Sequence, residues 1–211
     1  MKRRNFIKKT TIGSAAMVGI PSIVPASVFG KNSPSNRINI GQIGCGRIAR
    51  SHDLPETMNY DVSNVMAVCD LDSNRMKDGK ILVDNFYKEK KDKKRYNGTK
   101  MYEDYREMLL DKDIDAIMIS TPDHWHAQPA IEAALAGKDI YLQKPTSLTV
   151  KEGRQLVDAV KNSDVVLQVG TQQRAMPQFR IAAELVRNGR IGKLHTVKIG
   201  LPGDPSGPES T

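Results

Sequence analysis

Lys144 is the residue of this sequence best placed to move a proton. It follows directly on the short apolar run DIYLQ and precedes Pro145, which cannot continue a central strand. A lysine at the mouth of a strand, partly withdrawn from water, can serve as proton donor or acceptor. The alternative interpretations of Lys144 are a surface charge and an apolar stem that packs.

A glycine-rich turn stands in the run INIGQIGCGRIA, where Gly44, Gly46 and Ala49 have G-x-G-x-x-A spacing. The first glycine allows a tight turn, the second lets a pyrophosphate approach the backbone, and the small third residue lets helix and strand pack closely. About 24 residues after Gly46, Asp70 ends the run MAVCD, where a carboxylate can bind an adenosine ribose. This carboxylate would repel a 2′-phosphate and favours NAD, although nearby Arg75 keeps NADP open.

A third polar cluster, STPDHWHA, follows the apolar run DAIMIS. Thr121, His124, Trp125 and His126 should project around one strand end, and Asp123 can cap the following helix. The alternation of the two histidines could suggest zinc, but a zinc site needs further ligands at compatible spacing, so we predict no metal. The alternative to a binding role is a structural one, a polar helix cap beside the packed indole of Trp125.

These clusters need strands and helices that bring them together. The sequence predicts strands over residues 37–44, 62–70, 115–120, 139–143 and 165–170, and helices over 47–58, 73–87 (capped by Ser73), 123–136 and 151–161. Strands that alternate with helices over short connections predict an α/β fold, a doubly wound parallel (Rossmann) sheet. Its ligand site should lie at the carboxyl ends of the strands.

The C-terminal part of the chain predicts the start of a second α+β domain. A helix is expected over 177–188, followed by the run KLHTVKIG, whose alternation suggests a first strand. One strand cannot bury its own face, so we expect a fragment or truncated product that lacks most of this domain. The predicted organisation is an export signal (1–31), a linker (32–36), a dinucleotide-binding domain (37–175) and the start of a substrate and oligomerisation domain (176–211).

The charge of +8 lies mainly at the N-terminus. Residues 1–31 hold six of the 32 basic residues and no acidic one, so the remaining 26 nearly balance the 24 acids. We therefore expect no nucleic-acid binding. Cys45 and Cys69 both end apolar strand patterns, which favours buried small hydrophobic residues over a disulfide bridge.

The first thirty residues have the basic and moderately apolar regions of an export signal. Pro21 and Pro25 argue against a stable membrane span. Arg3 and Arg4, followed by FIK, resemble a twin-arginine signal, which implies a periplasmic or otherwise exported protein. A basic tail without export function is the alternative.

The whole set of motifs resembles the Gfo/Idh/MocA oxidoreductases. The runs GCGRIA, VCDLD, YEDYREML, TPDHWHA, LQKP and GTQQR stand in that family's order between about Arg37 and about Gly200. The resemblance implies an N-terminal domain that binds NAD or NADP, and a large C-terminal sheet that binds a sugar, glycoside or polyol and mediates homo-oligomers. It implies that Lys144 is catalytic and that the cofactor is bound by Gly44, Gly46, Arg47, Ile48, Asp70, Thr121, Pro122, His124, Trp125, His126, Gln143, Lys144 and Gln172.

The sequence departs from the family at Gln143, where glutamate is usual. A neutral amide can still hydrogen-bond the nicotinamide ribose, but it removes a charge next to Lys144. The Asp and His that often complete the family's site further downstream are not in these residues. Two other functions stay open: an NAD-using glycosidase of the related exported group, which usually lacks the lysine, and a nucleotide-binding remnant without turnover.

Export should depend on Arg3 and Arg4 as a pair. Replacing both with Lys keeps the charge of the basic region but removes the twin-arginine pattern, so precursor should accumulate in the cytoplasm. Fractionation of cells that express the tagged chain measures this. Unchanged export of the double variant would contradict the twin-arginine route, and Lys8→Arg serves as a control for a basic exchange outside the pair.

Overall fold

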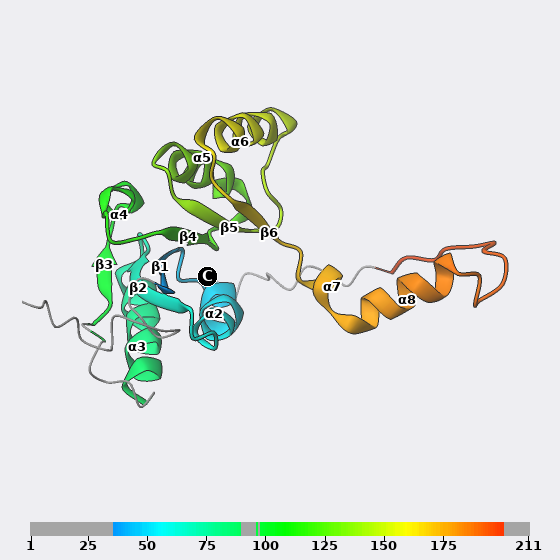
Figure 1. Cartoon of the computed structure of the whole chain (residues 1–211), viewed down its shortest axis with the longest axis horizontal. Coiled ribbons are helices and arrows are strands. Elements are labelled where there is room, and N and C mark those ends of the chain that lie inside the picture. The colour runs from blue at the N-terminus through cyan, green and yellow to red at the C-terminus, as the bar shows by residue number, and fades with distance from the viewer. Residues whose placement is uncertain (1–35, 90–95, 97, 201–211) are drawn as a thin grey trace, which may run out of the picture. The chain divides into compact units, whose positions relative to one another are not determined.

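Six strands form one sheet in the computed structural model, which describes residues 36–89, 96 and 98–200. The strands are β1 (Ile38–Ile43), β2 (Ser63–Cys69), β3 (Lys100–Tyr102), β4 (Ala116–Ile119), β5 (Asp139–Gln143) and β6 (Leu167–Gly170), in the order β3-β2-β1-β4-β5-β6 (Figure 1). The pairs β1–β2, β1–β4, β2–β3 and β4–β5 are parallel. This confirms the predicted doubly wound sheet.

Helices cover both faces of the sheet. The helical elements of this part of the chain are η3 (Ala49–Asp53, a π-helical turn), α2 (Leu54–Met58), α3 (Ser73–Glu89), α4 (Tyr105–Leu110), η5 (Asp123–Trp125), α5 (Ala127–Leu135) and α6 (Val150–Ser163). Two further helices, α7 (Gln172–Ala175) and α8 (Pro177–Arg187), follow later in the chain. In Figure 1, α5 and α6 lie on one side of the strands and α2 and α3 on the other. The chain divides into two compact units, residues 1–168 and 169–211.

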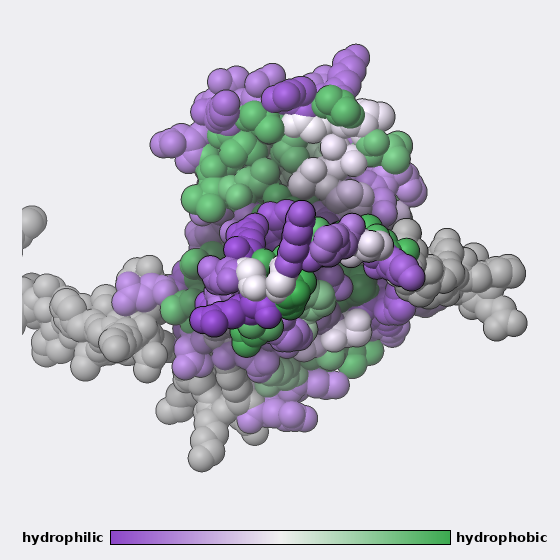
Figure 2. Space-filling view, turned by 90° about the vertical axis from the view of Figure 1, so that its right-hand side faces the viewer, coloured by the Kyte–Doolittle hydropathy of each residue, from purple (hydrophilic) through white to green (hydrophobic). Residues whose placement is uncertain are grey.

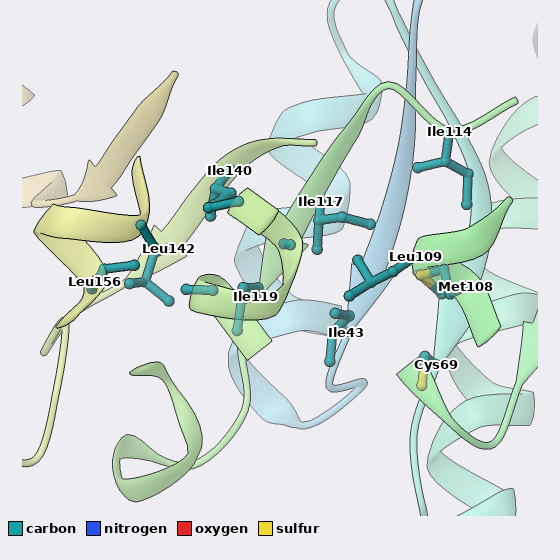
Figure 3. Close-up of a cluster of buried hydrophobic side chains, with 14 of the residues drawn as sticks. Ile43, Cys69, Met108, Leu109, Ile114, Ile117, Ile119, Ile140, Leu142 and Leu156 are labelled. Carbon is teal, nitrogen blue, oxygen red and sulfur yellow. The ribbon is translucent and has the colours of Figure 1, made fainter. Parts of the chain in front are cut away.

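Two apolar cores hold the helices to the sheet. The first lies under α4, α5 and α6, where Ile43, Ile117, Ile119 and Leu142 point into one cluster (Figure 3). The second lies under α2 and α3 and includes Met118. Residues of β4 thus feed both cores, which confirms that this strand is buried on both faces, as its unbroken apolar run predicts.

Both cysteines are buried and free, which confirms their interpretation as small core residues and excludes a bridge between them. Burial raises the pKa of the Cys45 thiol and of the Cys69 thiol to about 12. Both thiols are therefore protonated at neutral pH and unreactive.

Two predicted helix caps are wrong. The side chain of Asp72, one residue before Ser73, accepts hydrogen bonds from the backbone of Asn74 and Arg75 at the start of α3. Asp72 takes the cap because Ser73 already lies inside the helix. Asp123 does not cap α5, because it lies in the separate turn η5, and α5 begins after His126 without a side-chain cap.

The predicted strand over 193–200 is also wrong, because these residues form no strand and are all exposed. A strand needs a neighbour to pair with, and none of the described residues pairs with this segment. The sequence interpretation missed β3 and α4, which are short. The predicted export signal, most of the linker and most of the basic run at 88–95 lie outside the described residues.

The unit from Val169 onward contains α7 and α8. Helix α8 has exposed apolar side chains at Phe179, Ile181, Leu185 and Val186. On the face shown in Figure 2, hydrophobic residues are interspersed with hydrophilic ones. Among the described residues, none of the helices combines the length and the apolar character needed to cross a membrane.

Candidate active site

The parallel register brings the ends of four strands to one edge of the sheet. Ile43 of β1 pairs with Cys69 of β2 and with Ile119 of β4, and Ile119 pairs with Leu142 of β5. The residues that follow these ends are Gly44, Asp70, Ser120 and Gln143. Most of the predicted site residues therefore line one edge. Gln172 belongs to the second compact unit.

The glycine turn fits the roles that the spacing predicts. Gly44 has φ +83°, and a Cβ atom there would lie 2.8 Å from the backbone of Ser120 and Thr121. A Cβ on Gly46 would meet nothing within 4 Å, so the space over this residue is open. Ala49 is fully buried against the sheet. The open space over Gly46 is where a pyrophosphate could approach the backbone.

Asp70 is held rigidly at the end of β2. Its Oδ2 accepts a hydrogen bond from the Cys45 backbone N–H at 2.7 Å, and its Oδ1 accepts one from the Asp72 backbone N–H at 2.9 Å. The carboxylate is thereby fixed beside the glycine turn with lone pairs left for a ribose. Arg47 and Ile48 are exposed at the start of the helix that follows the turn.

The loop after β4 is closed by hydrogen bonds among its own residues. The Thr121 hydroxyl donates to the Trp125 carbonyl at 2.9 Å, and the Trp125 N–H donates to the Pro122 carbonyl at 2.8 Å. His124 and Trp125 are exposed, and 43% of the Trp125 surface is accessible. Pro122 and Asp123 of the same loop are exposed as well, so this whole stretch of the loop is accessible to a ligand.

His126 lies beneath this loop, 1% exposed. Its Nε2 is 2.8 Å from the Thr121 carbonyl oxygen, and its Nδ1 contacts the Pro145 carbonyl oxygen. The ring therefore braces the loop after β4 against the loop after β5. Both nitrogens face backbone, so the structure places His126 behind the edge where its predicted contact with the cofactor would be made.

Gln143 and Lys144 differ from each other in burial. Gln143 is 5% exposed; its amide N–H donates to Asp53 at 2.8 Å, and its carbonyl oxygen accepts from the Lys144 backbone N–H at 3.2 Å. The Lys144 side chain is exposed, and no ion pair with another described residue engages it. The described residues thus do not supply the partial withdrawal from water expected of Lys144. The Lys144–Pro145 peptide bond is cis.

The sequence interpretation missed Asp53, a carboxylate that is 3% exposed. It accepts hydrogen bonds from the Ser120 hydroxyl at 2.6 Å and from the Gln143 amide, and it lies 3.2 Å from His52 Nδ1. A usable signal was its spacing, because Asp53 stands four residues after Ala49 and so falls on the buried face of the helix. It also missed Gln42, fully buried, which donates to the carbonyl oxygens of Ile43 and Gly44.

The fold and the glycine turn are those of a dinucleotide-binding Rossmann domain. A family model described as "Oxidoreductase family, NAD-binding Rossmann fold" (GFO_IDH_MocA) matches residues 38–171, and the chain belongs to this family. This is the family that its motifs resemble.

Three similar proteins illustrate the family. The uncharacterized oxidoreductase YrbE of Bacillus subtilis is 34% identical over 78% of this chain and 44% of its own length. A glycosyl hydrolase family 109 protein of Shewanella baltica is 28% identical over 91% of this chain and 44% of its own length. The crystal structure of myo-inositol 2-dehydrogenase from Lactobacillus plantarum superimposes with a TM-score of 0.63 at 26% identity, over 74% of this chain and 43% of that one. The chain therefore spans less than half the length of each.

The two glycines should respond differently to the same added methyl group. Gly44→Ala should lower the free energy of unfolding by about 2–4 kcal/mol for two reasons. An alanine is strained at a positive φ, and its Cβ would clash with the backbone of Ser120 and Thr121. Gly46→Ala has room in the protein and should leave stability nearly unchanged, yet its methyl would occupy the pyrophosphate's path and raise the Kd for NADH about tenfold. Thermal unfolding and NADH fluorescence titration measure the two effects. Normal NADH affinity in Gly46→Ala would rule out that path.

Proposed function

We propose that this chain is the cofactor-binding part of an NAD(P)-dependent dehydrogenase that oxidises a hydroxyl group of a sugar, glycoside or polyol. The observation that supports it best is the common edge on which the Gly44 turn, Asp70 and Lys144 follow three strands of the same sheet. The similarity to a protein named myo-inositol 2-dehydrogenase supports a sugar or polyol as the substrate class.

The residues of this edge divide the reaction among them. Gly46 leaves room for the pyrophosphate, and Asp70 would accept hydrogen bonds from the adenosine ribose hydroxyls. NAD, when bound, would supply the hydride acceptor for oxidation of the alcohol to a carbonyl. Lys144 would hold the hydroxyl oxygen and accept its proton in the same step.

An NAD-using glycosidase is the second candidate, favoured by the similarity to a glycosyl hydrolase family 109 protein. Lys144 argues for the dehydrogenase, because the glycosidases of this kind usually lack that lysine. The two functions differ in net redox change. The dehydrogenase accumulates NADH with a free sugar or polyol, whereas the glycosidase releases sugar from a glycoside and leaves NAD unchanged.

Cofactor choice should depend on Asp70. Asp70→Ala should raise the Kd for NAD by about 10- to 100-fold, as expected for loss of hydrogen bonds to a charged acceptor. The Kd for NADP should rise much less, because the same change removes the carboxylate that repels a 2′-phosphate. Because Asp70 also anchors the Cys45 N–H, the informative quantity is the ratio of the two Kd values.

Asp72→Asn is the matched control for the cofactor experiment. Asp72 caps α3 and lies 3.6 Å from Arg75, so the amide keeps an acceptor at the cap and leaves Asp70 in place. Its affinity for NAD should stay within about twofold of wild type. If Asp70→Ala weakened NAD and NADP equally, the assignment of Asp70 to the ribose would be wrong.

Catalysis should depend on the Lys144 amino group. Lys144→Ala should leave NAD binding nearly intact and lower turnover by roughly 10²–10⁴-fold, the range for a positioned proton-transfer group. Lys144→Met keeps most of the apolar stem, and its turnover should fall as far as that of Lys144→Ala. Formation of NADH with a panel of sugars and polyols measures turnover, with Lys161→Met, at the far end of α6, as control. Near-normal turnover of Lys144→Met would make Lys144 a surface charge or a packing stem.

We also propose that the chain is exported through the twin-arginine route. Arg3 and Arg4 support this proposal, together with the concentration of basic residues before position 32. A dehydrogenase that carries its cofactor suits that route, because it exports folded proteins.

A further inference from the structure

Asp53 is the most deeply buried carboxylate near the edge that carries Lys144, at 3% exposure. Its partners come from three different elements: His52 precedes it in η3, Ser120 follows β4, and Gln143 ends β5. A buried carboxylate is strongly unfavourable unless hydrogen bonds replace its water. The strand ends that hold these partners are therefore tied to the position of Asp53.

Gln143 connects Asp53 to Lys144 through two hydrogen bonds. The Gln143 amide N–H donates to Asp53 at 2.8 Å, and the carbonyl oxygen of the same amide accepts from the Lys144 backbone N–H at 3.2 Å. These two bonds fix both the orientation of the amide and the point at which the chain leaves β5. The second donor, Ser120, directly precedes Thr121, so one carboxylate sets the ends of both strands.

Asp53 and Gln143 are also matched in charge. With a glutamate at position 143, two carboxylates would meet in a buried space where an amide now donates at 2.8 Å. Like charges at such a distance repel strongly when water is excluded. Within this pair the negative charge thus resides on Asp53, and Gln143 supplies the donor that it requires.

We propose that Asp53 is a positioning residue of the active site, which acts on catalysis through Gln143 and the backbone of Lys144. The proposal rests on the proposed function in so far as Lys144 is the proton-transfer group. It assigns a role to a side chain that touches neither cofactor nor substrate, and it identifies Asp53 and Gln143 as an exchangeable pair.

A charge exchange between the two positions tests the pairing. In Asp53→Asn the new amide cannot accept from both Ser120 and Gln143 as the carboxylate does, and Gln143→Glu sets two acids against each other. The double variant restores one carboxylate and one amide with their roles reversed, and the carboxylate introduced at position 143 can still accept from the Lys144 N–H. Each single variant should lower kcat at least tenfold, and the double variant should recover to within about threefold of wild type.

The split between kinetic parameters separates positioning from general stability. In Asp53→Asn we expect the Kd for NAD and the KM for the substrate to stay within about threefold while kcat falls. In a Lys144→Ala background, adding Asp53→Asn should lower kcat less than twofold further, because the Lys144 side chain through which Asp53 acts is gone. Asp139→Asn, the same exchange at the opposite end of β5, should leave kcat unchanged.

Three results would overturn the proposal. One is Asp53→Asn with kcat within twofold of wild type despite lowered stability, which would make Asp53 a structural anchor only. Another is a double variant no more active than the worse single variant. If the wild-type protein formed no NADH, the proposed function would fail, and the pairing would then be judged by unfolding of the four proteins. In those unfolding measurements, a double variant no more stable than the less stable single variant would overturn the pairing of Asp53 with Gln143.

Discussion

The close approach of the turn after β1 to the end of β4 is the constraint on which the rest of the site depends. Gly44 lies so near the backbone of Ser120 and Thr121 that no side chain fits between them. The Ile43 carbonyl oxygen accepts from the Ser120 N–H at 2.9 Å, and the Gly44 N–H donates to the Cys69 carbonyl oxygen at 2.9 Å. These contacts set the ends of three strands level, so the residues that follow them share one edge.

The strands and the main polar clusters could be predicted because their signals are local. Unbroken apolar runs, the glycine spacing and the acid after β2 each lie within a few residues of one another, and β5 ends at Gln143 as DIYLQ predicts. The contact between Asp53 and Gln143 could not be predicted in this way. It joins residues 90 positions apart, one in the helical turn η3 and one at the end of β5, which only the folded chain brings together.

The prediction errors have two physical causes. Ser73 and Asp123 both have side chains suited to capping, but a cap must stand at the residue where the helix begins, and sequence locates such boundaries only within a few residues. The interpretation of 193–200 as a strand relied on alternation alone. Alternation indicates which faces a strand would have, whereas the strand itself forms only when another backbone supplies its hydrogen bonds.

The brace formed by His126 has an evolutionary consequence. Its ring contacts the carbonyl oxygens of Thr121 and Pro145, which are main-chain atoms present whatever side chain a position bears. The two loops are therefore held together without relying on the chemistry of their exposed residues, such as His124 and Trp125. Mutation can exchange those side chains without removing the atoms that form the brace, so the exposed surface of this edge can vary while its framework stays intact.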